Sequence, residues 1–281
     1  MTRDQRLTGV MICGAGHSGS TLLGMIMGRT KGGFYMGEGA KARYLHDDKK
    51  PLRKRACKVC GEACPIWSTF NWDPDGKPLY WQVADHVDAS VIVDSTKNLA
   101  WIKARSAELI EGGDTAVLIF LQRDGRAVLN SRFRKYPERD AAEQIDAWKA
   151  QIRASRDVFE DFPGPKIAIQ YEQLATDPAG VISGVCEVAG LPYSDDMLNF
   201  TEDEVHPLGG NTGTQFVAAR DQIKANPDPI LKLTPRTENY YAKHSGDIRL
   251  DMRWKTEMSA PNLALFNELA GEFNAGMAWG D

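Results

Sequence analysis

A glycine-rich segment near the start of the chain has the residues best suited to bind an anion. Residues 14–21 read Gly-Ala-Gly-His-Ser-Gly-Ser-Thr, between an apolar run at 8–13 and apolar positions within 22–27. This order predicts a strand, a glycine loop and a buried helix. The first N–H groups of a helix are unpaired and favour negative charge, so a terminal phosphate or sulfate would fit this loop.

Other interpretations of the same loop are open. Gly14, Gly16 and Gly19 fit the G-x-G-x-x-G pattern of a dinucleotide-binding oxidoreductase, which would use NAD(P) or FAD. Glu38 lies 19 residues after Gly19, where such folds place an acid that binds the ribose. The spacing also matches a Walker A loop, but Ser20 stands where that motif has lysine, which argues against a kinase or NTPase. A glycine turn that only permits close packing is the structural alternative.

A second candidate anion site follows the longest apolar run, residues 116–121. Arg123 would leave the carboxyl end of a strand, and Ser131 lies eight residues later, about two turns along the next helix. Both side chains could therefore hold one phosphate group. The alternative is a surface ion pair between Arg123 and Asp124.

Together, these segments resemble the sulfotransferases that use 3′-phosphoadenosine 5′-phosphosulfate (PAPS), including bacterial members. Residues 14–23 resemble the family's 5′-phosphosulfate loop, and Arg123 with Ser131 matches its 3′-phosphate motif in residue type and spacing. Residues 169–174 are similar to the stretch after the family's fourth strand, which puts Tyr171 where a tyrosine contacts adenine.

Three further segments extend the resemblance from about residue 9 to residue 275. Residues 36–38 resemble the segment with the catalytic glutamate of protein-tyrosine sulfotransferases and their bacterial relatives. Residues 206–211 and 251–254 resemble the C-terminal end of the family. The resemblance implies in-line transfer of a sulfuryl group from PAPS to a hydroxyl or amine, with Glu38 as general base. The residues that it implies for donor binding are Gly16, His17, Ser18, Gly19, Ser20, Thr21, Arg123, Ser131 and Tyr171.

One residue departs from the family pattern. Most relatives have lysine or arginine where this chain has His17. Either His17 binds as imidazolium, or another cation replaces it, and Lys97 at a strand end is the candidate. We therefore expect His17 and Lys97 to act with Glu38 in catalysis, and we assign no metal because sulfuryl transfer requires none. A non-catalytic protein that binds PAPS or its bisphosphate product is a further alternative.

A cysteine cluster lies outside these motifs. Cys57, Cys60 and Cys64 have a spacing that could supply three zinc ligands, with His46 as a possible fourth. Packed thiols or a local disulfide are the alternatives. Similar segments ending in Cys-Pro-x-Trp occur in bacterial sulfotransferases, and this resemblance implies that the cluster stabilises a lid.

The elements that position these residues follow from the apolar runs. Strands expected at 8–13, 34–36, 91–93, 116–121 and 166–170 alternate with helices expected at 99–110, 124–133, 139–162, 178–189 and 261–275. This alternation predicts an α/β fold with a P-loop-like, doubly wound parallel sheet flanked by helices. We expect a single sulfotransferase domain over residues 1–281. It would carry a cysteine-containing insertion or lid at about 44–82 and a substrate and cofactor loop at about 201–248.

Composition limits the partners. The 281 residues carry 34 Lys+Arg and 38 Asp+Glu, a net charge of −4 that argues against general nucleic-acid binding. The apolar runs are far shorter than the ~20 residues of a membrane helix, and the charged start does not resemble a secretion signal. We therefore expect a cytoplasmic protein that acts on a small molecule rather than on nucleic acid or a membrane. The acceptor and the oligomeric state do not follow from the sequence.

Overall fold

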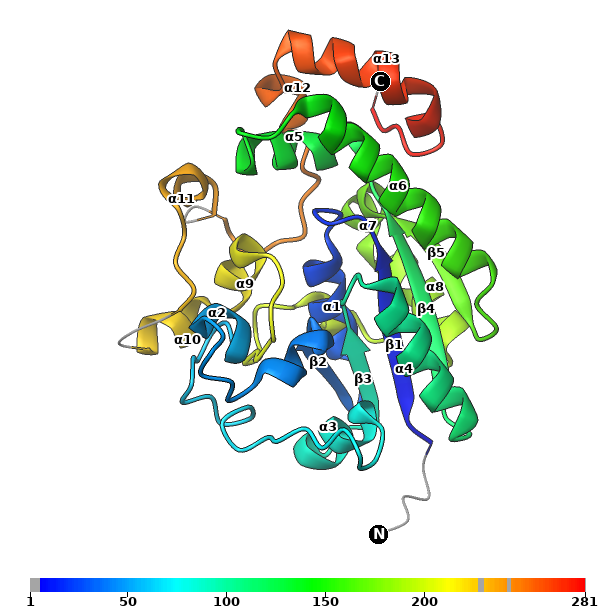
Figure 1. The fold of residues 1–281 in the computed structure, drawn as a ribbon, viewed down its shortest axis with the longest axis vertical. Helices are drawn as coiled ribbons and strands as arrows, with labels where there is room; N and C mark the ends of the chain where they lie inside the picture. Colours follow the sequence, from blue (N-terminus) through cyan, green and yellow to red (C-terminus); the bar gives the residue numbers. More distant parts are fainter. Residues whose placement is uncertain (1–5, 227–229, 242–243, 281) are drawn as a thin grey trace.

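The computed structural model describes residues 6–226, 230–241 and 244–280, and its centre is a five-stranded parallel sheet (Figure 1). The strand order is β2-β3-β1-β4-β5. The strands are β1 (Thr8–Gly14), β2 (Gly33–Gly37), β3 (Val91–Asp94), β4 (Thr115–Gln122) and β5 (Lys166–Gln170). Each matches an expected strand to within one residue at either end, and the predicted α/β class is confirmed.

Helices connect the strands and cover both faces of the sheet. The helical segments are α1 (Ser20–Gly28), η1 (Gly39–Tyr44), α2 (Leu52–Arg55), α3 (Leu79–Val87), α4 (Leu99–Glu111), α5 (Gly125–Lys135), α6 (Ala141–Glu160), α7 (Tyr171–Thr176), α8 (Pro178–Ala189), η2 (Asp195–Leu198), α9 (Thr212–Ala218), α10 (Arg220–Ala225), α11 (Pro235–Tyr241), α12 (Trp254–Glu257) and α13 (Ala260–Asn274). Val10 and Ile12 of β1 pack with α1, α7 and α8, whereas Met11 and Cys13 pack with α3, α4 and α6. Both rows of side chains are buried, which explains why β1 is a continuous apolar run.

Two connecting regions differ in character. The region at 201–248, expected to be a long loop, also contains the short helices α9, α10 and α11. The expected insertion at 44–82 has little regular structure apart from α2 and the first turn of α3. Within the described ranges, no helix combines the length and the apolar character needed to cross a bilayer.

The parallel strands bring the predicted site residues to one edge of the sheet. A different type of residue follows each strand. The glycine loop 14–19 follows β1, Glu38 follows β2 and Lys97 follows β3. Arg123 follows β4, and Tyr171 follows β5. All five strands point the same way, so these connections share the carboxyl edge, where ligands bind in folds of this class.

A buried carboxylate at the end of β3 holds several of these connections together. Asp94 Oδ1 accepts hydrogen bonds from the backbone N–H groups of Gly39 (2.9 Å) and Thr96 (2.7 Å). Its Oδ2 accepts from the Tyr80 hydroxyl (2.8 Å) and the Trp101 indole (2.9 Å). One side chain thus ties α3 and α4 to the segments that follow β2 and β3.

We expect Asp94→Asn to destabilise the fold strongly. The amide has one acceptor oxygen, and its NH2 group would face donors that now bind a carboxylate oxygen. Hydrogen bonds to charged groups contribute about 1.5 to 3 kcal/mol, so we expect the free energy of unfolding to fall by about 3 kcal/mol in urea denaturation. The exposed control Asp48→Asn should change it by about 0.5 kcal/mol or less. Equal stability of the two variants would contradict this role for Asp94.

Candidate functional site

The loop between β1 and α1 presents an open helix N-terminus. Gly19 precedes α1 in the left-handed conformation (φ +96°) and has no side chain with which to cap the first turn. A Cβ atom on Gly19 would lie 2.6 Å from the ring of Tyr171, so both the conformation and the contact require glycine. The first N–H groups of α1 are therefore suited to bind an anion.

The hydroxyl groups of this loop have different surroundings. The Ser18 hydroxyl is buried and has no hydrogen-bond partner among the described residues. Ser20 lines the adjoining cavity, whereas Thr21 Oγ1 accepts a hydrogen bond from Asn211 N (2.8 Å). A buried hydroxyl without a partner is uncommon in native proteins, and the Ser18 hydroxyl is free to donate a hydrogen bond to a ligand.

His17 lies in the middle of the loop, in the left-handed conformation (φ +75°). Its Nδ1 is 2.9 Å from Ser131 Oγ, and its carbonyl oxygen accepts a hydrogen bond from Arg123 (2.9 Å). Burial, followed by the positive charges of four nearby basic side chains, lowers the pKa of His17 to about 3. The imidazole is therefore neutral near pH 7, so His17 adds no positive charge to the loop at this pH.

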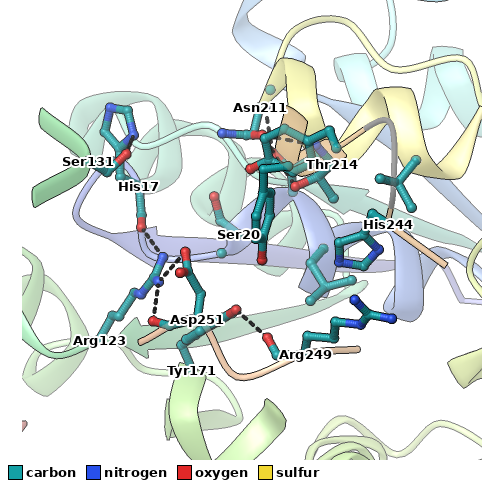
Figure 2. A pocket seen from close by; sticks show the side chains of 18 of the residues that line it. His17, Ser20, Arg123, Ser131, Tyr171, Asn211, Thr214, His244, Arg249 and Asp251 are labelled. Atoms are coloured by element: carbon teal, nitrogen blue, oxygen red, sulfur yellow. Dashed lines mark hydrogen bonds and ion pairs between the residues drawn. The ribbon is translucent and has the colours of Figure 1, made fainter. Parts of the chain in front are cut away.

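Arg123 forms the centre of the second candidate anion site (Figure 2). Besides His17, its guanidinium donates to Asp251 Oδ2 (3.2 Å) and lies 4.2 Å from the centre of the Tyr171 ring. Arg123 Nε, although buried, has no hydrogen-bond partner within the described part of the chain. The surface ion pair between Arg123 and Asp124 is wrong, because Asp124 is buried and pairs with Arg126 (2.7 Å).

Glu38 and Lys97 approach the cavity from the ends of β2 and β3. Glu38 Oε2 is 2.9 Å from Lys41 Nζ, and Glu38 N donates to Leu208 O (2.7 Å). Lys97 Nζ donates to Ser95 O (3.0 Å). Burial lowers the pKa of Lys97, and the negative charges of Glu38 and a neighbouring aspartate oppose this shift. A carboxylate and a lysine side chain thus both line the cavity.

A cavity of about 310 Å³ joins these groups. Ten of the eleven predicted site residues line it, and the eleventh, Ser18, is buried in the loop beneath it. Among the described residues that line it, five are lysine or arginine and three are aspartate or glutamate. An excess of positive charge in a protein with a net charge of −4 fits an anionic ligand. The individual roles of the predicted site residues stay predictions.

The C-terminal segment 247–253 adds four residues that the sequence analysis did not assign to the site. Asp247, Arg249, Asp251 and Arg253 all line the cavity, and they alternate with apolar residues. Asp251 accepts hydrogen bonds from Arg253 Nε (2.7 Å) and Nη2 (2.8 Å), and the adjacent positive charges hold the pKa of Asp251 well below its usual range. This alternation of charged and apolar residues, typical of an extended segment with one polar face, was the available signal.

Comparison with known proteins identifies the family. A model of the sulfotransferase family matches residues 9–195. This chain belongs to the sulfotransferase family. The solved structure of a sulfotransferase domain from the curacin biosynthetic pathway is 16% identical to it, with a TM-score of 0.54 and coverage of 95% of this chain and 99% of that chain. The sulfotransferase domain of the Synechococcus PCC 7002 olefin synthase is 18% identical, with a TM-score of 0.54 and coverage of 97% and 96%. No match was found among curated proteins.

The sheet order of this sulfotransferase argues against the dinucleotide interpretation. In the Rossmann order 3-2-1-4-5-6, the second strand lies beside the first and its acidic residue reaches the ribose. Here β3 lies between β1 and β2, so Glu38 follows a strand that is not a neighbour of the glycine loop's strand. The predicted ribose-binding acid is therefore not on the neighbouring strand. The acid that ends that strand, Asp94, already accepts four hydrogen bonds within the fold.

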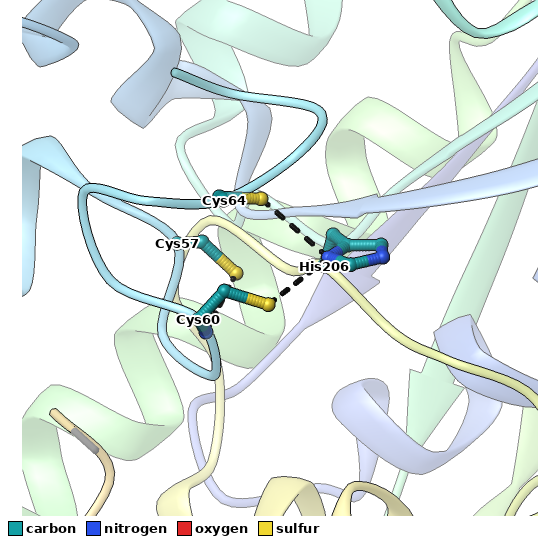
Figure 3. A group of neighbouring side chains, drawn as sticks. All are labelled: Cys57, Cys60, Cys64 and His206. Atoms are coloured by element: carbon teal, nitrogen blue, oxygen red, sulfur yellow. Dashed lines mark hydrogen bonds between the residues drawn. The ribbon is translucent and has the colours of Figure 1, made fainter. Parts of the chain in front are cut away.

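The cysteines of the sulfotransferase are brought together, but with a different histidine. Cys57, Cys60 and Cys64 are free thiols, and they lie around His206 (Figure 3). The proposed fourth ligand His46 is wrong, because it lies outside this group and its Nε2 contacts Phe70 O (3.0 Å). These four side chains could hold a metal ion at some distance in the sequence from the glycine loop.

The neutral His17 leads to a pH prediction. Histidine in the unfolded chain has a pKa near 6.5. Between pH 6.5 and pH 3, His17 is therefore protonated in the unfolded chain but neutral in the folded protein. The contribution of His17 to the free energy of unfolding is therefore fully present above pH 6.5 and decreases as the pH falls toward 3. From pH 7 to pH 5, wild type should lose about 1 to 2 kcal/mol more unfolding free energy than His17→Asn, which tolerates the left-handed backbone. Urea denaturation in buffers free of phosphate and sulfate measures this, and parallel pH profiles would contradict it.

Proposed function

We propose that this protein transfers a sulfuryl group from PAPS to a hydroxyl or amine of a small molecule. The observation that supports the proposal is that two separate candidate anion sites line one cavity. One is the N-terminus of α1 with the Ser18 hydroxyl, which has no hydrogen-bond partner among the described residues. The other is Arg123, whose Nε makes no hydrogen bond there and lies 4.0 Å from Glu172 Oε1. A nucleotide with an acidic group on each side of its ribose requires two such sites, whereas a nucleoside triphosphate requires one.

The residues present fit the donor. The first turn of α1, with Ser18 and Ser20, would hold the phosphosulfate, and Arg123 with Ser131 would hold the 3′-phosphate. Tyr171 would contact the adenine. When bound, PAPS supplies an activated sulfuryl group whose leaving group is adenosine 3′,5′-bisphosphate. Membership of the sulfotransferase family supports this donor.

The chain's own contribution is proton transfer and charge stabilisation. Glu38 Oε2 is paired with Lys41, and within the described residues its Oε1 has no ion-pair partner, so this oxygen can accept the proton of the attacking hydroxyl or amine. Lys97 and the loop N–H groups would stabilise negative charge that develops on the transferred group and the leaving oxygen. His17, neutral and bonded to Ser131, would orient the loop rather than supply charge.

The size of the site supports a small acceptor. A second cavity of about 230 Å³ shares His17, Arg123 and Ser131 with the first. Cavities of a few hundred cubic ångströms are suited to small molecules rather than to a folded protein surface. The basic side chains Arg134, Lys135 and Arg253 line this second cavity.

The donor site is tested by calorimetric titration with adenosine 3′,5′-bisphosphate. We expect binding to weaken by about 1.5 to 3 kcal/mol in Arg123→Ala, the contribution of hydrogen bonds to a charged group. Ser131→Ala, which leaves the arginine in place, should lose about 0.5 to 1.5 kcal/mol. The exposed Arg156→Ala makes the same change of charge and should bind normally. Binding of NADH without binding of the bisphosphate would contradict the proposal.

The general base is tested by Glu38→Gln. The amide keeps the shape of the side chain but cannot accept the proton, so turnover should fall by about 100-fold or more while bisphosphate affinity is retained. Release of bisphosphate from PAPS is measured with a panel of phenols, sugars and amines. Exposed Glu187→Gln on α8 is the matched control. Near-normal turnover of Glu38→Gln would refute the base, and bisphosphate binding without any turnover in wild type would support a non-catalytic binding protein.

A further inference from the structure

Four side chains from two distant segments converge on one point. The sulfur atoms of Cys57, Cys60 and Cys64 and a ring nitrogen of His206 all lie within 4.8 Å of one another (Figure 3). His206 Nδ1 is 3.3 Å from Cys60 Sγ and 3.5 Å from Cys64 Sγ. Cys57 and Cys64 are fully buried, and His206 is 9% exposed. The cysteines come from the insertion, and the histidine precedes α9.

The two nitrogen–sulfur separations are close to an edge of a zinc tetrahedron. With Zn–S near 2.3 Å and Zn–N near 2.0 Å, tetrahedral geometry puts sulfur and nitrogen about 3.6 Å apart and two sulfurs about 3.8 Å apart. Hydrogen bonding among neutral thiols explains the arrangement less well. Nδ1 has one lone pair, and two sulfurs lie within hydrogen-bond distance of it while a third sulfur faces the same point.

We propose that Cys57, Cys60, Cys64 and His206 bind a structural zinc ion. Thiolate and imidazole ligands favour zinc, and four protein ligands leave no open position, as is typical of structural rather than catalytic sites. Neighbouring groups fit this assignment. The N–H of Cys60 donates to Cys57 Sγ (3.5 Å), and Glu204 Oε2 lies 3.7 Å from His206 Nε2, where a carboxylate orients a ligating imidazole.

The ion would fasten the insertion to the strand that carries the proposed base. Directly after His206, Pro207 O accepts a hydrogen bond from Lys58 N (3.1 Å), so the segment also pairs with the cysteine turn. The next residue, Leu208, donates to Met36 O (2.9 Å) and accepts from Glu38 N (2.7 Å). Only Pro207 separates the histidine ligand from Leu208, whose carbonyl oxygen holds the Glu38 backbone. Zinc would therefore fix the end of β2 without contacting the reaction.

Metal content tests the site directly. The full-length chain, purified without a histidine tag and under reductant, should contain one zinc per chain by mass spectrometry of the metal. Cys64→Ser and His206→Ala should each lose most of it. The buried control Cys186→Ser and the nearby control His46→Ala should keep it. Less than about a tenth of an equivalent of zinc, with no uptake after incubation with zinc sulfate and reductant, would overturn the proposal.

If the variants fail to fold, a spectroscopic measurement on wild-type protein still tests the site. Wild-type protein exchanged with Co²⁺ should show the strong visible bands of a tetrahedral cobalt site and a thiolate-to-cobalt charge-transfer band. Octahedral-type weak bands, or a thiol count in denaturant that reveals a disulfide among the three cysteines, would overturn the zinc site. These measurements need neither PAPS nor an acceptor, so failure of the zinc site and failure of the proposed sulfotransfer are distinguishable.

Discussion

The common direction of the five strands is the constraint on which the site depends. Residues that end one strand are remote in sequence from those that end the next, yet a parallel sheet brings all of them to the same edge. The sheet alone is enough to bring together four predicted site residues: Glu38, Lys97, Arg123 and Tyr171. The fold then only has to fix their orientation, and the four hydrogen bonds accepted by Asp94 do this for the connections after β2 and β3.

The same convergence concentrates positive charge around one cavity. Burial is the main reason that the pKa values of His17 and Lys97 are lowered, and for His17 the positive charges of four nearby basic side chains add to this effect. Asp251 and Glu38 offset part of this charge by pairing with Arg123 and Lys41 respectively. An anion bound in the cavity would neutralise the remaining positive charge. Anion binding would therefore also stabilise the fold.

The sequence predicts those parts of the molecule that depend on local patterns. Each buried parallel strand is an apolar run, and the glycine loop has a fixed spacing, so the sheet and the strand–loop–helix order at the glycine loop follow directly. The partner of the cysteine cluster does not follow, because His206 lies 142 residues from Cys64 and nothing local distinguishes it from His46. The acidic partner of Arg123 was missed for the same reason: pairing across the molecule depends on how α12 and the segment before it return to the sheet.

The contact between Asp251 and Arg123 makes anion binding an exchange of partners. A phosphate that reaches Arg123 meets a guanidinium already neutralised by a carboxylate, so its net gain is the difference between two ion pairs. Asp251 would keep an ion-pair partner if Arg123 bound a phosphate, because Arg253 donates two hydrogen bonds to it. Under the proposed function, the segment 247–253 would therefore set how strongly Arg123 binds a nucleotide. Weaker binding at this arginine would shorten the time for which the product nucleotide stays bound.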